Sequence, residues 1–226
     1  MKIIIATIKS WNIKKAYNFK NNNANDIYIF TDKNELTYEK VNHINPQYIF
    51  FPHWSWIISK EIYEKFNCVV FHITDLPFGR GGSPLQNLID IGIENTKISA
   101  LKVCNGIDSG DIYLKENLNL NGSADEIFMR ASEIIFKDMI PKIINENIVP
   151  TKQKGEIVEF KRRNFSQSEI LLDFNLKKIY DYIRMLDGEG YPKAFIRFGK
   201  YKLEFSRASL KNNKIIADVE IIDEDD

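Results

Sequence analysis

Two separated loops hold most of the side chains in this chain that could do chemistry. Residues 72–86 read HITDLPFGRGGSPLQ, and residues 105–111 read NGIDSGD. The His72 imidazole can exchange protons near neutral pH, and the Asp108 carboxylate could hold and polarise it. Glycines in the first loop let backbone N–H groups approach a ligand closely, and Arg80 supplies a fixed cation. If both loops lie at one edge of a sheet, they predict a site that moves protons.

Each loop has a plainer interpretation when it is taken alone. A lone histidine is more often structural than catalytic, and the Asn-Gly and Asp-Ser-Gly-Asp residues of the second loop favour an ordinary turn. Asp111 is expected to support that turn rather than to react, and Cys104 is expected to pack in the interior. The case for chemistry therefore depends on the two loops meeting.

The elements that must position these loops alternate between strands and helices over the first 150 residues. Apolar runs rich in β-branched and aromatic residues predict strands at 2–8, 27–31, 48–51, 68–72, 98–103 and 112–118. Helical spacing of apolar residues predicts helices at 13–22, 59–66, 83–92 and 123–147. The alternation predicts an α/β fold with a Rossmann-like, mostly parallel sheet covered on both faces. Ligands bind at the carboxyl edge of such sheets, which is where His72 ends its strand.

Serines mark the starts of three of these helices. Ser59 and Ser83 are expected N-caps, and Pro84 fits the first helical position after Ser83. Ser123 and Glu126 have the spacing of a capping box. One predicted helix therefore begins inside the first polar loop.

The composition changes after residue 150. Residues 152–164, KQKGEIVEFKRRN, are polar and basic and predict a linker that crosses the surface. Residues 176–186 predict a short amphipathic helix, and strands are expected at 194–198, 201–205 and 215–222. We therefore expect one domain over residues 1–150, followed over residues 151–226 by a linker and a small α+β appendage with a solvated acidic end.

The overall composition is that of an ordinary globular protein. Lys+Arg and Asp+Glu number 31 each among 226 residues, and this zero net charge argues against a protein built mainly to hold nucleic acid. Cys68 and Cys104 lie in apolar surroundings without metal-ligand spacing, so they predict buried thiols of a reducing cytosol. The opening MKIIIATIKS is too short for a signal peptide or a spanning helix. We expect a soluble cytoplasmic protein without a metal site.

Taken together, the two loops resemble the signature of the folate-dependent formyltransferases. Residues 72–86 keep the pattern HxTxLPxxRGxxPLQ, and residues 96–112 keep TxxSxxKxxxGIDSGDI. The resemblance covers roughly residues 48–145, with a looser similarity over 183–195. That group includes methionyl-tRNA formyltransferase, glycinamide ribonucleotide transformylase and the sugar N-formyltransferases.

The resemblance implies the formyltransferase fold and transfer of a formyl group from N10-formyltetrahydrofolate to a primary amine. His72 stands at the family's catalytic histidine and Asp108 at its catalytic aspartate. The amine must lose a proton as it attacks the formyl carbon, and the negative oxygen must be stabilised. Imidazole suits both tasks, and Asp108 would orient the ring or relay the proton through water.

One position departs from the family's pattern. The family usually has an asparagine two residues before the histidine, and here that residue is Val70, which has no side-chain donor. Losing one oxyanion donor typically costs about 3 kcal/mol of transition-state stabilisation. Another donor substitutes, protonated His72 acts alone, or the protein is impaired; the candidate donors are Asn87, Asn105 and His53.

The segment FPHWSWII, residues 51–58, lies where the family has the loop beside its folate pocket. Trp54 and Trp56 could stack on a planar ring, although core packing explains either one equally well. The residues expected to meet the folate are Trp54, Trp56, Ile57, Ile58, Arg80, Gly81 and Asp111. Those expected to meet the acceptor substrate are Thr74, Gly79, Gln86 and Lys9.

The short, neutral chain with its acidic tail disfavours tRNA as the acceptor, and the C-terminal region looks like that of the sugar N-formyltransferases. We therefore expect a nucleotide-linked 4-amino-4,6-dideoxy sugar of surface-glycan or pseudaminic-acid-type biosynthesis. A formyltetrahydrofolate hydrolase and a non-catalytic folate- or nucleotide-binding module are the alternatives. No nucleic-acid or membrane partner is expected, and a homodimer is possible.

Overall fold

The computed structural model describes residues 1–224 and divides the chain into two compact units. The first unit comprises residues 1–81, 96–118 and 129–159. The second comprises residues 82–95, 119–128 and the chain from 160 onward. The predicted division into domains of residues 1–150 and 151–226 stays a prediction.

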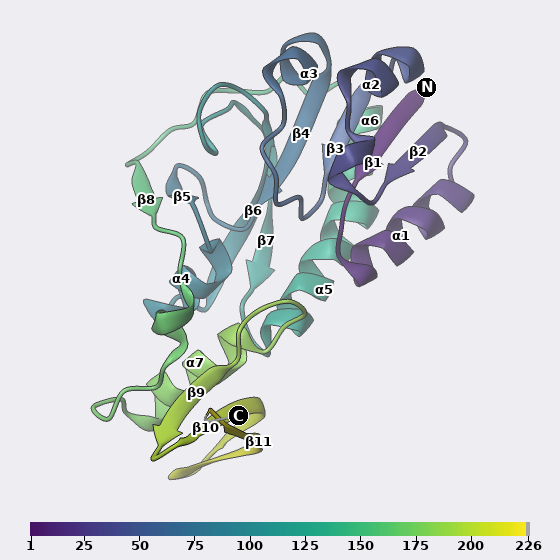
Figure 1. Ribbon diagram of the computed structural model, residues 1–226. Coiled ribbons are helices and arrows are strands. Elements are labelled where there is room, and N and C mark those ends of the chain that lie inside the picture. The colour runs from purple at the N-terminus through teal and green to yellow at the C-terminus, as the bar shows by residue number, and fades with distance from the viewer. Residues whose placement is uncertain (225–226) are drawn as a thin grey trace. The chain divides into compact units, whose positions relative to one another are not determined.

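The first unit is built on a six-stranded sheet with the strand order β2-β1-β3-β4-β6-β7 (Figure 1). Strand β1 pairs in parallel with β2 and β3, β3 pairs in parallel with β4, and β4 pairs antiparallel with β6. The strands are β1 (Lys2–Ala6), β2 (Asp26–Phe30), β3 (Tyr48–Phe51), β4 (Asn67–His72), β6 (Asn95–Lys102) and β7 (Ile112–Asn119). The predicted mostly parallel sheet is confirmed.

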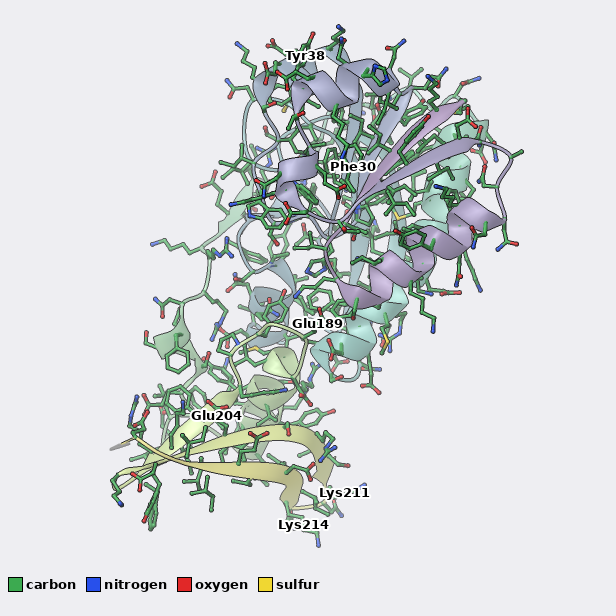
Figure 2. The ribbon with its side chains drawn as sticks, turned by 45° about the vertical axis from the view of Figure 1, so that its right-hand side comes forward. Phe30, Tyr38, Glu189, Glu204, Lys211 and Lys214 are labelled. Carbon is green, nitrogen blue, oxygen red and sulfur yellow. The ribbon has the colours of Figure 1, made fainter. Side chains whose placement is uncertain are left out.

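Apolar side chains bury one face of this sheet under two short helices, α2 (Tyr38–Ile44) and α3 (Lys60–Lys65). Ile4, Ile49 and Phe51 point to this face and form one core cluster with apolar residues of both helices. Figure 2 shows Tyr38 at the start of α2. Continuous apolar strands of this kind are typical of sheets covered on both faces.

The neighbouring strand residues Ile3, Ile5 and Phe50 are also fully buried, so the opposite face is covered as well. A long helical stretch includes a π-helical turn, and the ring of Phe19 packs edge-on against Phe136 within that turn, with centroids 6.0 Å apart. Phe19 belongs to α1 (Ser10–Asn21), and the long helical stretch consists of α5 (Ala124–Ile134), η2 (Ile135–Met139) and α6 (Ile140–Asn145).

The helix predicted over 123–147 forms as a continuous helical stretch over residues 124–145 that includes this π-turn. Pro141 lies just after the turn and has no N–H to give to the carbonyl one turn back, and π-turns accommodate such breaks. The predicted start of this helix is confirmed, because the backbone N–H of Ser123 donates to Glu126 at 2.8 Å and the N–H of Glu126 donates to Ser123 Oγ at 3.3 Å.

The predicted surface linker, most of which is exposed, also contains a short strand. Strand β8 (Val158–Phe160) pairs with β5 (Phe78–Gly81), and Thr151 and Ile112 exchange two backbone hydrogen bonds of 2.8 and 2.9 Å. The sequence analysis missed this strand because a short polar strand carries no hydrophobic periodicity, and its partner lies 80 residues earlier; the linker itself stays a prediction.

The described part of the second unit contains a three-stranded antiparallel sheet, two complete α-helices, a 3₁₀-helix and the start of α5. The sheet has the order β11-β10-β9, and Figure 2 shows Lys211 and Lys214 at the turn of its longest hairpin. The elements are α4 (Pro84–Asp90), η3 (Phe165–Ser168), α7 (Leu176–Leu186), β9 (Ala194–Phe198), β10 (Tyr201–Lys211) and β11 (Lys214–Asp223). The predicted small α+β region near the C-terminus is confirmed, and the predicted bounds of α7 match.

Two serines do not act as the predicted caps. Ser83 has a left-handed backbone with φ of 50°, and its Oγ accepts the backbone N–H of Arg163 rather than one from α4. A capping hydroxyl needs extended backbone to reach the first turn, so this geometry excludes the cap. Ser59 has extended backbone but makes no capping hydrogen bond.

The two cysteines differ in burial. Cys68 is 1% exposed, and burial raises the pKa of its thiol to about 12. The prediction that Cys104 packs in the interior was wrong, since it lies in the exposed turn after β6. Within residues 1–224, no helix combines the length and apolar character that crossing a membrane requires.

Candidate active site

His72 and Asp108 come together although 36 residues separate them in the sequence. His72 is the last residue of β4 and is 8% exposed. Its Nδ1 lies 3.4 Å from Oδ2 of Asp108, in the loop between β6 and β7. Its Nε2 lies 2.7 Å from the carbonyl oxygen of Gly79. The ring is therefore held between a carbonyl and a carboxylate.

The Gly79 carbonyl decides where the neutral ring carries its hydrogen. A carbonyl oxygen can only accept, so Nε2 must be the donor in this contact. Nδ1 then holds the lone pair of the neutral ring and faces Asp108. After protonation at Nδ1, the ring can donate to both acceptors.

The backbone of the Asp108 loop is tightly constrained. Asp108 has φ of 50°, a left-handed conformation that is costly for a non-glycine residue, and Gly81 donates its N–H to Oδ2 at 3.0 Å. A Cβ on Gly110 would lie 1.7 Å from the carbonyl oxygen of Lys102, so only glycine fits there. The Asp111 carbonyl accepts the Lys102 N–H at 2.8 Å, which places Asp111 in the turn as expected.

A glutamine that the sequence analysis did not single out joins both loops. Arg80 donates from Nε and Nη2 to Oε1 of Gln153 at 3.1 and 2.8 Å. Nε2 of Gln153 donates to the carbonyl oxygens of Asp108 and Gly110, both at 2.8 Å. Its position in a polar, basic segment gave no signal of this role.

The rest of the first loop is anchored by polar contacts. Thr74 is fully buried, and its hydroxyl lies 3.5 Å from the Gly79 carbonyl. Asp75 is paired with Lys97 and Lys115. Burial opposes ionisation of Asp75, but hydrogen bonds from Lys115 and Lys97 outweigh it and lower the pKa of this carboxyl.

The aromatic loop after β3 is held in place by hydrogen bonds to the buried carbonyl of Pro52. The oxygen of Pro52 accepts the Thr7 hydroxyl at 2.6 Å and the Asn12 amide at 3.4 Å. The rings of Trp54 and Trp56 meet edge to face, with centroids 4.9 Å apart.

The two isoleucines that follow differ completely in exposure. Ile57 is 98% exposed, whereas Ile58 is 7% exposed and belongs to the core cluster under α2 and α3. The structure therefore places Ile58 with the core and Ile57 in solvent, and their predicted folate contacts stay predictions.

The remaining predicted residues lie in different surroundings. His53 has φ of 58° and meets the Trp11 ring edge-on at 6.0 Å, while Lys9 lies 5.8 Å from the centroid of the same ring. Asn105 is exposed at the start of the Asp108 loop. Val70 is partly buried in β4, where it lies between Phe51 of β3 and Leu101 of β6.

Two predicted site residues belong to the second unit and are bonded there. Asn87 donates both amide hydrogens, to the carbonyls of Gly82 and Lys161 at 2.9 and 3.0 Å. Gln86 is buried and donates to the carbonyl of Met185 at 3.1 Å.

Comparison with known proteins identifies the family. The model of the methionyl-tRNA formyltransferase C-terminal domain matches residues 165–222. The structure of methionyl-tRNA formyltransferase from Clostridium thermocellum is 68% identical, covers 99% of this chain and 99% of that chain, and superposes with a TM-score of 0.97. The chain belongs to the methionyl-tRNA formyltransferase family.

Curated relatives within this family support the assignment. The methionyl-tRNA formyltransferase of Rickettsia typhi is 33% identical over 135 residues, which are 58% of this chain and 45% of that protein. That of Caldicellulosiruptor saccharolyticus is 31% identical over 159 residues, which are 68% of this chain and 51% of that protein. The chain thus spans about half the length of the curated methionyl-tRNA formyltransferases it matches.

Membership in this family corrects the predicted acceptor. The nucleotide-linked amino sugar, its role in glycan biosynthesis and the likeness to sugar N-formyltransferases were wrong, since the 68% identical structure is a methionyl-tRNA formyltransferase. The C-terminal similarity that suggested a sugar lies in the stretch matched by the methionyl-tRNA formyltransferase domain model.

The predicted absence of a nucleic-acid partner is contradicted by the same finding. It rested on the net charge of the whole chain, which says little about local charge. Between residues 152 and 163 basic side chains outnumber acidic ones five to two, whereas residues 223–226 are all acidic and cancel that excess.

Proposed function

We propose that this chain transfers a formyl group from N10-formyltetrahydrofolate to the amino group of methionyl-tRNA in the cytoplasm. The 68% identity with a methionyl-tRNA formyltransferase over 99% of both chains is the observation that carries this proposal. The paired His72 and Asp108 support it, because they supply a base and a counter-charge at one place.

His72 is the base in this proposal. The Gly79 carbonyl keeps the hydrogen of the neutral ring on Nε2, so Nδ1 is the nitrogen that can take the proton lost by the attacking amine. Burial of the ring and its contacts on both sides fix its orientation, which removes the need to organise it during the reaction.

Asp108 is the counter-charge. When Nδ1 of His72 gains a proton, the carboxylate 3.4 Å away stabilises the new cation. The Gly81 N–H and the left-handed backbone hold that carboxylate toward the ring. Catalysis by this pair therefore depends on the loop geometry as much as on the two side chains.

We propose Asn105 as the oxyanion donor in preference to His53, which lies on the loop after β3 with its ring against Trp11. Val70 has no side-chain hydrogen to donate, and both hydrogens of the Asn87 amide are bonded to backbone carbonyls. Both ring nitrogens of His72 already face acceptors. Asn105 is exposed and lies three residues before Asp108 on the same loop. The Asn105→Ala variant is therefore expected to lower kcat about a hundredfold.

The aromatic loop fits a folate. Trp54 Nε1 is buried and has no hydrogen-bond partner among residues 1–224, so a donor and an aromatic surface lie side by side with Trp56. A pterin offers a flat ring with hydrogen-bond acceptors, which suits both features. When bound, the folate supplies an activated formyl group on N10. Arg80 and Gly81 continue the proposed folate contacts on the first loop.

Basic side chains are proposed to hold the tRNA. Lys161 and Arg162 are exposed directly after β8. Each lysine or arginine that meets a phosphate releases a counterion and makes binding weaker at high salt. The KM for methionyl-tRNA is therefore expected to rise with salt, and less steeply in a K161A/R162A variant.

The proposed activity is tested with the purified chain, N10-formyltetrahydrofolate and tRNA charged with radiolabelled methionine. After alkaline release from the tRNA, formylmethionine is separated from methionine and counted. We expect catalytic turnover with the charged tRNA and none with free methionine plus uncharged tRNA. Formylmethionine at the rate seen without protein would contradict the proposal.

A further inference from the structure

We propose that Gln153 is a positioning residue that couples Arg80 to the loop carrying Asp108. The proposal rests on the formyl-transfer function above and deepens it. It assigns to the segment around Gln153, in the linker expected at the start of the second predicted region, the task of setting the active-site geometry. Gln153 itself touches neither His72 nor a reacting atom.

The amide of Gln153 makes four hydrogen bonds, and each of them goes to one of the two site loops. Its Oε1 accepts twice from Arg80, and its Nε2 gives both hydrogens to the carbonyls of Asp108 and Gly110. An amide has two donor hydrogens and two acceptor lone pairs, so this pattern uses all of them. Such a fully satisfied group favours one arrangement of its partners.

The Asp108 loop needs this support. Asp108 has a left-handed backbone, which costs a non-glycine residue free energy unless its surroundings hold it. The bond to the Asp108 carbonyl fixes the peptide group that follows this residue. Together with the Gly81 N–H on Oδ2, it fixes both ends of Asp108.

Backbone hydrogen bonds hold the chain in place before and after Gln153. Thr151 and Ile112 exchange two backbone hydrogen bonds before it, and the N–H of Val158 donates to the Pro77 carbonyl at 3.4 Å after it. Gln153 is half-buried, whereas Lys152 and Lys154 on either side are exposed. Of these three consecutive residues, only the glutamine is partly buried, and its amide bonds to both site loops.

Two substitutions separate the two halves of this role. Gln153→Glu keeps an acceptor for Arg80 but replaces both donated hydrogens with a charge that faces two carbonyls. Gln153→Met keeps the length of the side chain and loses all four bonds. Lys152→Ala, one residue away and exposed, is the matched control.

The two substitutions are expected to differ in the KM for N10-formyltetrahydrofolate and to share a loss of kcat. Gln153→Glu should lower kcat ten- to a hundredfold with the KM for N10-formyltetrahydrofolate within about twofold of the parent value, because only the Asp108 loop is released. Gln153→Met should lower kcat similarly and also raise that KM, because Arg80 is released as well. An equal KM for N10-formyltetrahydrofolate in both variants, or an unchanged kcat in either, would overturn the proposal.

Amide hydrogen exchange at Gly81 tests the coupling without turnover. Its N–H donates to Asp108, so release of the Asp108 loop should speed its exchange at least tenfold in both Gln153 variants and leave it unchanged in Lys152→Ala. Unchanged exchange in folded Gln153 variants would overturn the positioning role. Since this measurement needs no substrate, an inactive parent protein would refute the proposed function alone.

Discussion

The backbone N–H of Gly81 donates at 3.0 Å to the same carboxylate oxygen of Asp108 that faces Nδ1 of His72. One oxygen of Asp108 therefore contacts both the glycine-rich loop and the His72 ring. Glycine at position 81 has φ of 103°, a conformation that other residues rarely adopt. The arrangement links the backbone of one loop directly to the chemistry proposed for the other.

The Asp108→Asn variant tests the charge at this junction. Asparagine keeps an oxygen that can accept the Gly81 N–H, so the loop is expected to stay in place. It cannot offer a negative charge to protonated His72, so kcat should fall at least a hundredfold while the KM values change little. A rate within threefold of the parent protein would show that the carboxylate charge has no part in the reaction.

The Gly110→Ala variant tests the close approach beneath the Asp108 loop. Its Cβ would lie 1.7 Å from the Lys102 carbonyl, so the backbone must move and the free energy of unfolding should fall by about 2–4 kcal/mol. Gly199→Ala is the matched control, because nothing lies within 4 Å of its Cβ and only its left-handed φ of 61° is penalised, by about 1 kcal/mol. Urea denaturation measures both, and equal losses would contradict the steric argument.

Much of this organisation follows from short-range patterns in the sequence. The continuous β-branched run at residues 3–5 predicts a buried strand, and the spacing of apolar residues over 176–186 predicts an amphipathic helix. The spacing of the family's motifs identifies His72 and Asp108. Gln153 could not be found this way, because its importance lies in two loops more than 40 residues away.

The features that the sequence analysis missed or misjudged also depend on contacts between distant parts of the chain. Strand β8 exists through pairing with β5, and the exposure of Cys104 depends on where the chain leaves β6. The acceptor was misjudged in part because the net charge of the whole chain adds the basic residues of 152–163 to the acidic residues of 223–226, which are distant in the sequence. Local pattern predicts elements, whereas long-range contacts decide which loops meet.

Acid stability should report the ion pairs of Asp75. Lys115 and Lys97 lower the pKa of this carboxyl in the folded protein despite the opposing effect of burial. The ionised group therefore stabilises the fold above the ordinary carboxyl value of about 4, and this stabilisation is lost as the pH falls toward the lowered pKa. The stability difference between the parent and Asp75→Asn should be constant from pH 5 to 7 and shrink below pH 4. A difference that does not depend on pH would refute the ion pairing.

The two thiols should differ sharply in reactivity. Cys68 is buried with a pKa of about 12, whereas Cys104 is exposed. A thiol reagent at pH 8 should therefore modify one cysteine per native chain and two after denaturation. The native reaction should disappear in Cys104→Ser, and fast modification of Cys68 in the native protein would contradict its burial.

The most direct test of the account is the single-turnover rate of formyl transfer to methionyl-tRNA by the parent protein and by His72→Ala, each shown to be folded by its unfolding transition. We predict that removal of the imidazole lowers this rate at least a thousandfold while N10-formyltetrahydrofolate still binds. A folded variant that transfers formyl within tenfold of the parent rate would contradict the central role given to His72.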